Sequence, residues 1–269
     1  GRQAIGFGRI SLFSPLDIIA PFPPDALDTD IRPGVDALRA SRYFGMAGQV
    51  SAAMVLGRTE EQNSYVLYGE NNWAGIDVLA ITGRLRRRPM VGLGFATQLA
   101  GMGVKGEAVR YEGQGVGQPG GDLHEHFTIA GVELDYRFDN GLILFVQYLY
   151  NGAGVDHPEQ YGQVAASAPL QEGLSYLLGR HYLLLAPSYE LHPLVTVNGL
   201  WLWNLQDHSY LFRPLLHISL SDNWTLDLFW NMTQGKKPAE LDPAVPIPAS
   251  SSEFGATSNS GGLLLKYFF

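Results

Sequence analysis

Apolar and polar residues alternate one by one along much of the chain. In residues 127–138, valine, leucine and tyrosine fall on one face of an extended chain, and Glu133, Asp135 and Arg137 fall on the other. In residues 224–231, leucines and a tryptophan lie opposite threonine, aspartate and asparagine. Because successive side chains of a β-strand point to opposite faces, this period of two indicates strands with one apolar and one polar face.

The alternation predicts an all-β fold with fourteen strands. They span residues 2–13, 34–44, 48–57, 63–71, 74–86, 90–100, 103–112, 126–138, 141–151, 180–191, 194–206, 209–220, 224–234 and 261–269. Most have about the 9–11 residues that a tilted strand needs to cross a bilayer. We therefore predict a transmembrane antiparallel β-barrel of about 14 strands, which forms a single domain over residues 1–269.

The predicted connections fall into two groups that alternate along the chain. One group is short, and its Gly, Asn and Asp residues suit tight hairpin turns. The other group includes four long segments, residues 14–33, 113–125, 152–179 and 235–260. Outer-membrane barrels sort their connections in this way, with short periplasmic turns and longer outer loops. An even number of strands then places both ends on the periplasmic side.

Composition supports a membrane location. Hydrophobic residues make up 46% of the chain and charged residues only 16%, whereas soluble domains carry about 25% charged residues. No apolar run approaches the roughly 20 residues of a transmembrane helix. Low charge without long apolar runs is typical of a transmembrane barrel, in which alternation dilutes the hydrophobic signal.

Cysteine content and charge exclude several classes of protein. The chain has no cysteine, which excludes disulfides and thiolate metal sites and is compatible with exposure to the periplasm. The net charge of −8 argues against a nucleic-acid partner. We expect neither a metal nor a cofactor. The chain opens in strand-like sequence without a signal peptide, so we expect a mature or truncated start that lacks N-terminal sequence.

The last predicted strand, residues 261–269, reads GGLLLKYFF. With a period of two, Tyr267 and Phe269 share one face with two leucines. An apolar strand that ends in aromatics at the C-terminus resembles the closing strand of bacterial outer-membrane barrels, whose final Phe helps the barrel-assembly machinery recognise its client. The resemblance implies that Tyr267 and Phe269 form a membrane-assembly signal.

A second resemblance starts in the sequence GRQAIGFGR and continues through residues 14–39, SPLDIIAPFPPDALDTDIRPGVDALR. Together these segments resemble a signature of a porin-like family of proteobacterial outer-membrane proteins. The NGAG sequence at 151–154, GRHY at 179–182 and the C-terminal aromatics are similarly spaced. The resemblance spans most of the chain and implies location and architecture far more than substrate. Members usually carry sequence before the GRQ strand, and the barrel would have 16–18 strands if upstream strands are missing.

Charged residues on the polar faces of the predicted strands are candidates to line a pore. An Arg or Lys that faces lipid near the bilayer midplane costs about 2–4 kcal/mol, so these side chains are expected to face water or to pair across strands. The candidates are Arg39, Lys105, Glu107, Glu133, Asp135, Arg137, Arg213, Asp227 and Lys266. Their mixed signs favour a polar channel with modest ion preference. The alternative is an ion-pair network that plugs a narrow barrel.

The long segment at residues 14–33 is a candidate constriction. Five prolines lower the entropy of its free state, so that it can hold one shape. By similarity to porins, it can fold inward as a constriction with its acids facing basic wall residues; the alternative is an ordered outer loop packed against its neighbours. The candidate constriction residues are Asp17, Asp25, Asp28, Asp30 and Arg32.

Two further clusters lie at predicted outer turns. The arginine-rich residues 84–88 suit either bidentate contacts with lipopolysaccharide phosphates or a solvated turn. Asp122, His124, Glu125 and His126 have residue types that can bind a divalent metal, but water-exposed loop histidines are the favoured interpretation. No spacing presents a nucleophile to its base, so we do not expect an enzyme.

The sequence therefore predicts a porin-like channel of the bacterial outer membrane for passive diffusion of small hydrophilic solutes or ions. The alternative is a structural or scaffold barrel that holds a periplasmic or lipoprotein partner, including a redox protein. An outer-membrane hydrolase is a third interpretation. The expected partners are outer-membrane lipid, lipopolysaccharide and the barrel-assembly machinery, with a homo-oligomer or a periplasmic partner left open.

Overall fold

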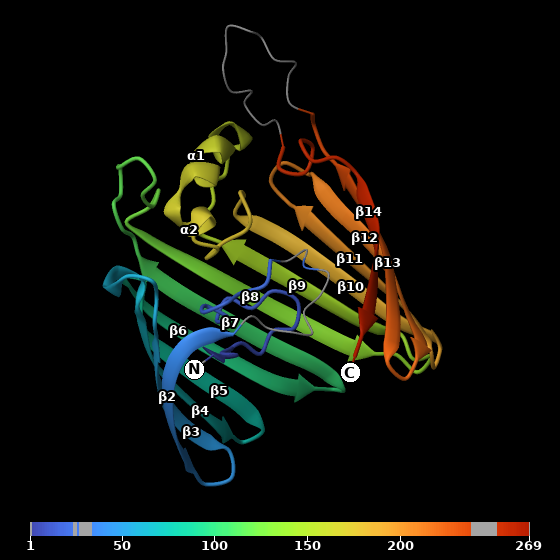
Figure 1. The fold of residues 1–269 in the computed structure, drawn as a ribbon, viewed down its shortest axis with the longest axis horizontal. Coiled ribbons are helices and arrows are strands. Elements are labelled where there is room, and N and C mark those ends of the chain that lie inside the picture. Colours follow the sequence, from blue (N-terminus) through green and yellow to red (C-terminus); the bar gives the residue numbers. More distant parts are fainter. Residues whose placement is uncertain (1, 24–25, 27–33, 238–251, 269) are drawn as a thin grey trace, which may run out of the picture.

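The computed structural model describes residues 2–23, 26, 34–237 and 252–268. They form an all-β fold with fourteen antiparallel strands in one sheet, and the strand order follows the chain order. The sheet is strongly curved (Figure 1). This result confirms the predicted all-β fold class and the strand number. Among the described residues, the strand pairings join neighbours in this order and do not include a pair between β1 or β2 and β14.

The strands agree with the predicted boundaries to within a few residues, apart from the first. They are β1 (Arg2–Gln3), β2 (Val35–Phe44), β3 (Gly48–Val55), β4 (Ser64–Trp73), β5 (Ile76–Leu85), β6 (Arg88–Leu99), β7 (Met102–Glu112), β8 (His126–Arg137), β9 (Ile143–Asn151), β10 (His181–His192), β11 (Val195–Asn204), β12 (Tyr210–Ser221), β13 (Trp224–Gln234) and β14 (Ser260–Tyr267). The short helices are α1 (Tyr161–Ala166) and α2 (Ala168–Gln171), with single 3-10 turns at Glu60–Gln62 and Pro158–Gln160.

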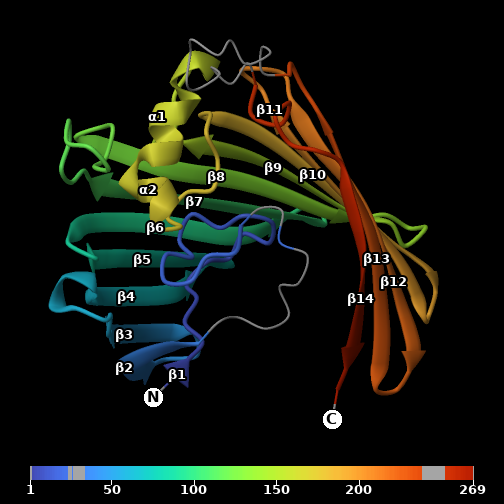
Figure 2. The ribbon, with the colours of Figure 1, turned by 45° about the horizontal axis from the view of Figure 1, so that its top comes forward.

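The prediction of a strand over residues 2–13 is wrong. Only Arg2–Gln3 pairs with β2, and the chain then leaves the sheet and runs along its concave side (Figure 2). We call residues 4–23 the inner segment. Several of its backbone N–H groups bond to side chains of the sheet and not to a neighbouring strand. Alternation alone could not distinguish this arrangement from a strand.

The two groups of connections lie at opposite rims of the sheet, as predicted. One rim carries tight turns, in which Gly45, Gly75 and Gly101 adopt φ values of 59°, 83° and 81° that favour glycine. The other rim carries the longer connections, including the one with α1 and α2. We call it the loop rim. The β5–β6 turn at this rim is also tight, and Arg86 and Arg87 both have positive φ.

The two faces of the sheet differ in what they expose. On the convex face large apolar side chains are exposed, among them Leu93 (61%), Trp230 (53%) and Leu263 (64%). On the concave face the buried core joins the inner segment to the sheet, with Phe13 and Leu16 packed among strand residues. No helix in the described parts of the chain is long and apolar enough to cross a membrane.

Candidate functional site in the concave interior

The inner segment starts where β1 pairs with β2. Arg2 pairs with Asp36 and Gln3 pairs with Val35, at the loop-rim end of β2. From there the segment lies against the concave face of the sheet (Figure 2). It therefore occupies space that the curved sheet would otherwise leave to solvent.

Glu107 of β7 is the first of three side chains that hold the inner segment. Its carboxylate is 4% exposed. One oxygen, Oε1, accepts the backbone N–H groups of Arg9 and Ile10, the latter at 2.9 Å. The other, Oε2, accepts the Ser14 hydroxyl at 2.5 Å and the Leu16 N–H at 3.3 Å. One carboxylate thus fixes a tight bend of the segment.

Glu133 of β8 and Gln147 of β9 continue this row along the wall. Glu133 accepts the N–H of Ser11 at 2.9 Å and that of Leu12 at 3.0 Å. The Gln147 amide accepts the N–H of Phe13 at 3.0 Å and donates to the carbonyl oxygen of the same residue at 2.6 Å. Glu133 and Gln147 face each other across the two strands. Five consecutive N–H groups, from residue 9 to residue 13, therefore bond to acceptors on one wall.

Lys105 completes this group of side chains. Its ammonium lies 2.9 Å from Glu133 and 3.2 Å from Asp135, and donates to the Ser11 hydroxyl at 2.7 Å. A buried carboxylate is costly unless it is paired and hydrogen-bonded, and here a cation and backbone donors supply both. We call Lys105, Glu107, Glu133 and Gln147 the docked wall.

Glycines in the wall give the segment room to approach. A Cβ added at Gly92 would lie 2.5 Å from Leu16 Cδ2, and one added at Gly94 would lie 3.0 Å from Leu16 Cδ1. A Cβ at Gly131 would lie 3.2 Å from Ile10 Cδ1. Contacts this short are tighter than ordinary van der Waals packing, so these strand glycines fit the close approach of another chain segment.

The remaining strand candidates lie elsewhere on the sheet. On the strands farthest along the chain, His217 Nδ1 is 2.6 Å from Asp227 Oδ1, and Lys266 Nζ is 3.4 Å from Asp227 Oδ2. Arg213 is buried on β12 and donates to the Ala26 carbonyl oxygen at 2.9 Å. We call Arg213, His217, Asp227 and Lys266 the opposite wall. Arg39 on β2 and Arg137 on β8 are exposed.

The constriction candidates are described only in part. Asp17 is buried at the inner segment, and its N–H bonds to the Ser14 carbonyl oxygen at 3.1 Å. Asp25, Asp28, Asp30 and Arg32 lie outside the described residues. Of the two assembly-signal candidates, Tyr267 ends β14 beside Trp224, with ring centroids 4.9 Å apart, and Phe269 also lies outside the described residues.

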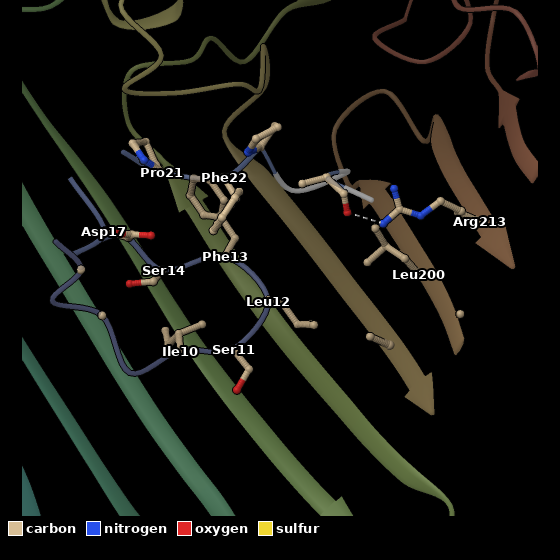
Figure 3. A pocket seen from close by; sticks show the side chains of 16 residues that line it. Ile10, Ser11, Leu12, Phe13, Ser14, Asp17, Pro21, Phe22, Leu200 and Arg213 are labelled. Atoms are coloured by element: carbon tan, nitrogen blue, oxygen red, sulfur yellow. Dashed lines mark hydrogen bonds between the residues drawn. The ribbon is translucent and has the colours of Figure 1, made fainter. Parts of the chain in front are cut away.

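A cavity of about 570 Å³ separates the inner segment from strands β10–β12. Figure 3 shows Leu12, Phe13 and Phe22 of the inner segment on one side and Leu200 and Arg213 of the sheet on the other. The concave interior is therefore not filled on this side. The segment narrows the interior and leaves an opening along the opposite half of the sheet.

At the loop rim, Arg88 departs from the solvated turn expected for residues 84–88, whereas Arg84 and Arg87 are exposed. Arg88 is 1% exposed, and its guanidinium makes bonds of 2.9 and 2.6 Å to the two carboxylate oxygens of Asp122. It also pairs with Glu172. Both expectations for the run, lipopolysaccharide binding and a solvated turn, are therefore wrong for Arg88, because its donors join two long loops to the sheet.

A second network joins the loops around Glu253. Its carboxylate accepts the Leu178 N–H at 2.8 Å, the Tyr182 hydroxyl at 2.5 Å and the Asn204 amide at 2.8 Å. Its own N–H donates to Asp207 at 2.7 Å. Burial raises the pKa of Glu253 to about 7, because the donors only partly offset the loss of hydration and Asp207 adds negative charge.

Several of these residues were not identified from the sequence. Gln147 has the parity of a concave-face residue in its strand, so alternation could have found it. Glu253 lies in a long connection, where no periodic pattern applies, and only the three-dimensional contacts reveal its role. His217 is a third such residue, and it pairs with Asp227.

Comparisons with known proteins add no assignment. No protein-family model matches the chain, and a search of curated proteins returned no match.

Among the described residues, no group of three or more His, Asp or Glu side chains is arranged to hold a metal ion. His124 contacts the Gly154 carbonyl oxygen at 3.2 Å, and His126 pairs with Glu112 at 2.7 Å. The functional proposal therefore rests on the geometry of the sheet and its interior.

Proposed function

We propose that this chain forms the wall of a bacterial outer-membrane β-barrel and acts as a channel for passive diffusion of small hydrophilic solutes or ions. The observation that carries the proposal is the contrast between the two faces. Large apolar side chains are exposed on the convex face, whereas the concave face buries charged side chains such as Glu107 and Asp227 together with its apolar core. A soluble sheet protein places its apolar face in the core, whereas a membrane barrel places it against lipid.

The rims support the same proposal. Short turns gather at one rim and long connections at the other, as in outer-membrane barrels. Exposed aromatics near the short-turn rim include Trp73, Tyr136 and Trp224, and aromatic side chains at such positions suit a membrane–water interface. The partners of this proposal are outer-membrane lipid and lipopolysaccharide around the barrel, and the assembly machinery that inserts it.

The inner segment gives the channel a constriction. It is held to the wall by buried acceptors and leaves a cavity on its other side. A solute would pass through this polar opening down its gradient, and no bond chemistry is involved. The constriction differs from the one expected from the sequence, because its described part starts before residue 14.

The scaffold alternative requires an interior wall of small residues, such as Gly92 and Gly94, that is open to a partner. The chain's own Leu16 packs against these glycines, so they do not provide a surface for a partner. No other contact of the described residues favours a bound redox protein or lipoprotein. The channel is therefore the function that the geometry supports best.

Single-channel conductance of the purified protein in planar bilayers tests the proposal. We expect stable conductance steps whose ion preference shifts when Arg137→Glu reverses an exposed charge of the concave face. Arg110→Glu, on the opposite parity of β7, serves as a matched control outside the lumen. A folded, heat-modifiable barrel that never conducts would exclude the channel, and a search for a bound partner would follow.

A further inference from the structure

A groove of about 550 Å³ lies on the convex face of strands β2–β5, and its surface is almost entirely apolar. Figure 1 shows these four strands side by side at one end of the curved sheet, in blue and teal. Leu38 and Leu67, which line the groove, are 66% and 52% exposed, whereas their chain neighbours Ala37 and Val66 are buried toward the interior. The groove therefore belongs to the face that the proposed function places against lipid.

Small side chains form the floor of the groove. One row of cross-strand neighbours consists of Ala40, Ala52, Leu67 and Thr82, and all four line the groove. Because neighbouring strands lie about 4.8 Å apart, small side chains at this level leave a depression between larger ones. In a bilayer, apolar groups associate with a protein surface mainly through close van der Waals packing. The depression therefore suits a hydrocarbon chain that fits into it.

The next row toward the loop rim has larger side chains and ends in a charge. It consists of Leu38, Met54, Tyr65 and Arg84. The first three line the groove, and Arg84 is the cross-strand neighbour of Tyr65. Tyr65 is 48% exposed, and Arg84 is exposed as well. An apolar groove thus has an aromatic ring and a cation at its loop-rim end.

Arg84 has donors that the protein itself does not use. Its Nε donates to the Arg87 carbonyl oxygen at 3.2 Å, and within the described parts of the chain its side chain makes no other hydrogen bond or ion pair. The remaining N–H groups of a guanidinium match the oxygens of a phosphate in a bidentate geometry. Asp36, an acid of the same face, lies three strands away on β2. This end of the groove therefore favours an anion.

The position of Arg84 at the loop rim indicates which lipid can supply that anion. In outer-membrane barrels the longer loops face the outside of the cell. The proposed function therefore places the loop rim at the outer leaflet, which consists of lipopolysaccharide. The lipid anchor of this molecule carries phosphate groups next to its acyl chains. One molecule can thus place a phosphate at the rim and an acyl chain in the groove.

A second groove on the convex face separates lipid packing from recognition of a phosphate. It has a volume of about 590 Å³, spans β11–β14 and is also almost entirely apolar, with Trp230 and Leu263 in its lining. The acids and bases in the described residues of these strands, Arg213, Asp227 and Lys266, belong to the opposite wall on the concave face. An apolar depression therefore occurs twice on the convex face, but the groove on β2–β5 has a cation at its end.

We propose that the groove on β2–β5 binds the lipid anchor of lipopolysaccharide, with a phosphate at Arg84 and an acyl chain against Ala40, Ala52 and Leu67. The inference rests on the outer-membrane location in the proposed function and not on conduction. It assigns a lipid partner to one surface of the sheet. The phosphate contact lies at the exposed Arg84 of the arginine run and not at the buried Arg88.

Native mass spectrometry of the detergent-solubilised full chain measures the binding of added lipid A, the lipid anchor of lipopolysaccharide. Dephosphorylated lipid A tests the need for a phosphate. Phosphatidylglycerol, which has one phosphate and two acyl chains, tests whether any anionic lipid is sufficient. We expect wild-type protein to bind lipid A about tenfold more tightly than either of the other two lipids, as for one charge-assisted contact.

Variants assign the binding to its residues. We expect Arg84→Gln to weaken lipid A binding about tenfold and to leave binding of the dephosphorylated lipid unchanged, with partial recovery in Arg84→Lys. Ala52→Phe fills the groove and should weaken binding while Arg84 is kept. Two matched controls should bind normally. They are Arg110→Gln, at an exposed arginine of the convex face of β7, and Ala130→Phe, at a convex-face alanine of β8 outside the groove.

The outcomes separate the lipid site from the channel. Equal losses in Arg84→Gln and Arg110→Gln would assign the effect to general charge attraction and overturn the site. Equal binding of dephosphorylated lipid A or of phosphatidylglycerol would overturn lipopolysaccharide as the occupant. Lipid A binding by a protein that never conducts would keep the site and exclude the channel, and conductance without lipid A binding would do the reverse. If Arg84→Gln fails to fold, Ala52→Phe carries the test, and unchanged binding in that variant contradicts the proposal.

Discussion

The docked wall and the opposite wall use the same residue types in different ways. On the docked wall, Glu107 and Glu133 accept backbone N–H groups of a segment about a hundred residues away in sequence. On the opposite wall, Asp227 pairs with His217 and Lys266 of the two neighbouring strands. An acidic side chain on the concave face can therefore either hold the inner segment against the sheet or form ion pairs with side chains of the neighbouring strands. Its role depends on whether the inner segment lies over it.

This difference has an energetic basis. Hydrogen bonds to charged groups are worth about 1.5–3 kcal/mol each, and the two docked carboxylates receive several from one segment. Such a set fixes the path of the backbone whatever its side chains are. Ion pairs between side chains of neighbouring strands, in contrast, add to a sheet that backbone hydrogen bonds already hold together. Substitution of the acids should therefore detach the inner segment from the docked wall. On the opposite wall it should change only the local charge.

The largest effect is expected for Glu107→Ala combined with Glu133→Ala. The pair of substitutions leaves the N–H groups of residues 9–12 without their acceptors, so we expect the inner segment to detach. Limited proteolysis should then cut within residues 9–16, and single-channel conductance should rise severalfold. Asp135→Ala is the matched control, since Asp135 neighbours Lys105 on the same wall without a hydrogen bond to the described inner segment. An unchanged conductance in the double variant would show that the segment does not constrict the lumen.

A smaller effect is expected when the wall is filled and its acids are kept. Gly92→Val places new atoms against Leu16 and Ile81, where a Cβ alone would lie 2.5 and 2.8 Å from side-chain carbons. Overpacking of this kind costs about 1–3 kcal/mol, so we expect a lower midpoint of thermal unfolding and partial exposure of the segment to protease.

Two further variants test the cause of that loss. Leu16→Ala in the Gly92→Val background should restore part of the stability, because it removes the side chain that the valine displaces. Gly69→Ala should be tolerated, since its added Cβ would have no neighbour closer than 3.8 Å. No recovery in the double variant would mean that Ile81, and not Leu16, takes the strain.

At the loop rim, neutral hydrogen-bond donors surround the carboxylate of Glu253. Its pKa is raised from 4.5 to about 7 by burial. Its stabilising contribution is therefore fully present below pH 4.5 and is lost as the pH rises through 7. One pKa unit corresponds to about 1.4 kcal/mol, so the loss amounts to a few kcal/mol at most.

The measurement is thermal unfolding and loop proteolysis across this pH window. We expect the wild-type loops at residues 152–179 to become more accessible to protease above pH 7. Glu253→Gln cannot ionise and should remove this dependence on pH. A pH profile that is the same in both proteins would assign the transition to another group.

The smallest effect is expected on the opposite wall. Asp227→Asn keeps the size of the side chain and can still accept a hydrogen bond from His217, so we expect a stability change of about 1 kcal/mol. The ion preference should shift modestly toward anions, because a negative charge of the lumen is removed. Protease protection of the inner segment should not change. Release of the inner segment in this variant would contradict the inference that only the acids of the docked wall hold it.

Much of the fold could be predicted from the sequence, and the exceptions have one cause. Thirteen of the fourteen strands were placed correctly, because the period of two is a local property that each strand carries by itself. Residues 4–13 show the same local character, but no neighbouring strand pairs with them. Their partners, Glu107, Glu133 and Gln147, lie far along the chain, and no local pattern indicates that they accept backbone donors.

The candidate site divides in the same way. The sequence by itself determined which residues share the concave face, since parity within a strand decides this before any tertiary contact forms. It therefore placed Lys105, Glu107 and Glu133 on one face, which in the structure is the concave face. Only the tertiary structure decided that these side chains hold the inner segment and that Arg88 is buried with Asp122. Burial and pairing depend on contacts between distant parts of the chain, and a periodic pattern carries no information about them.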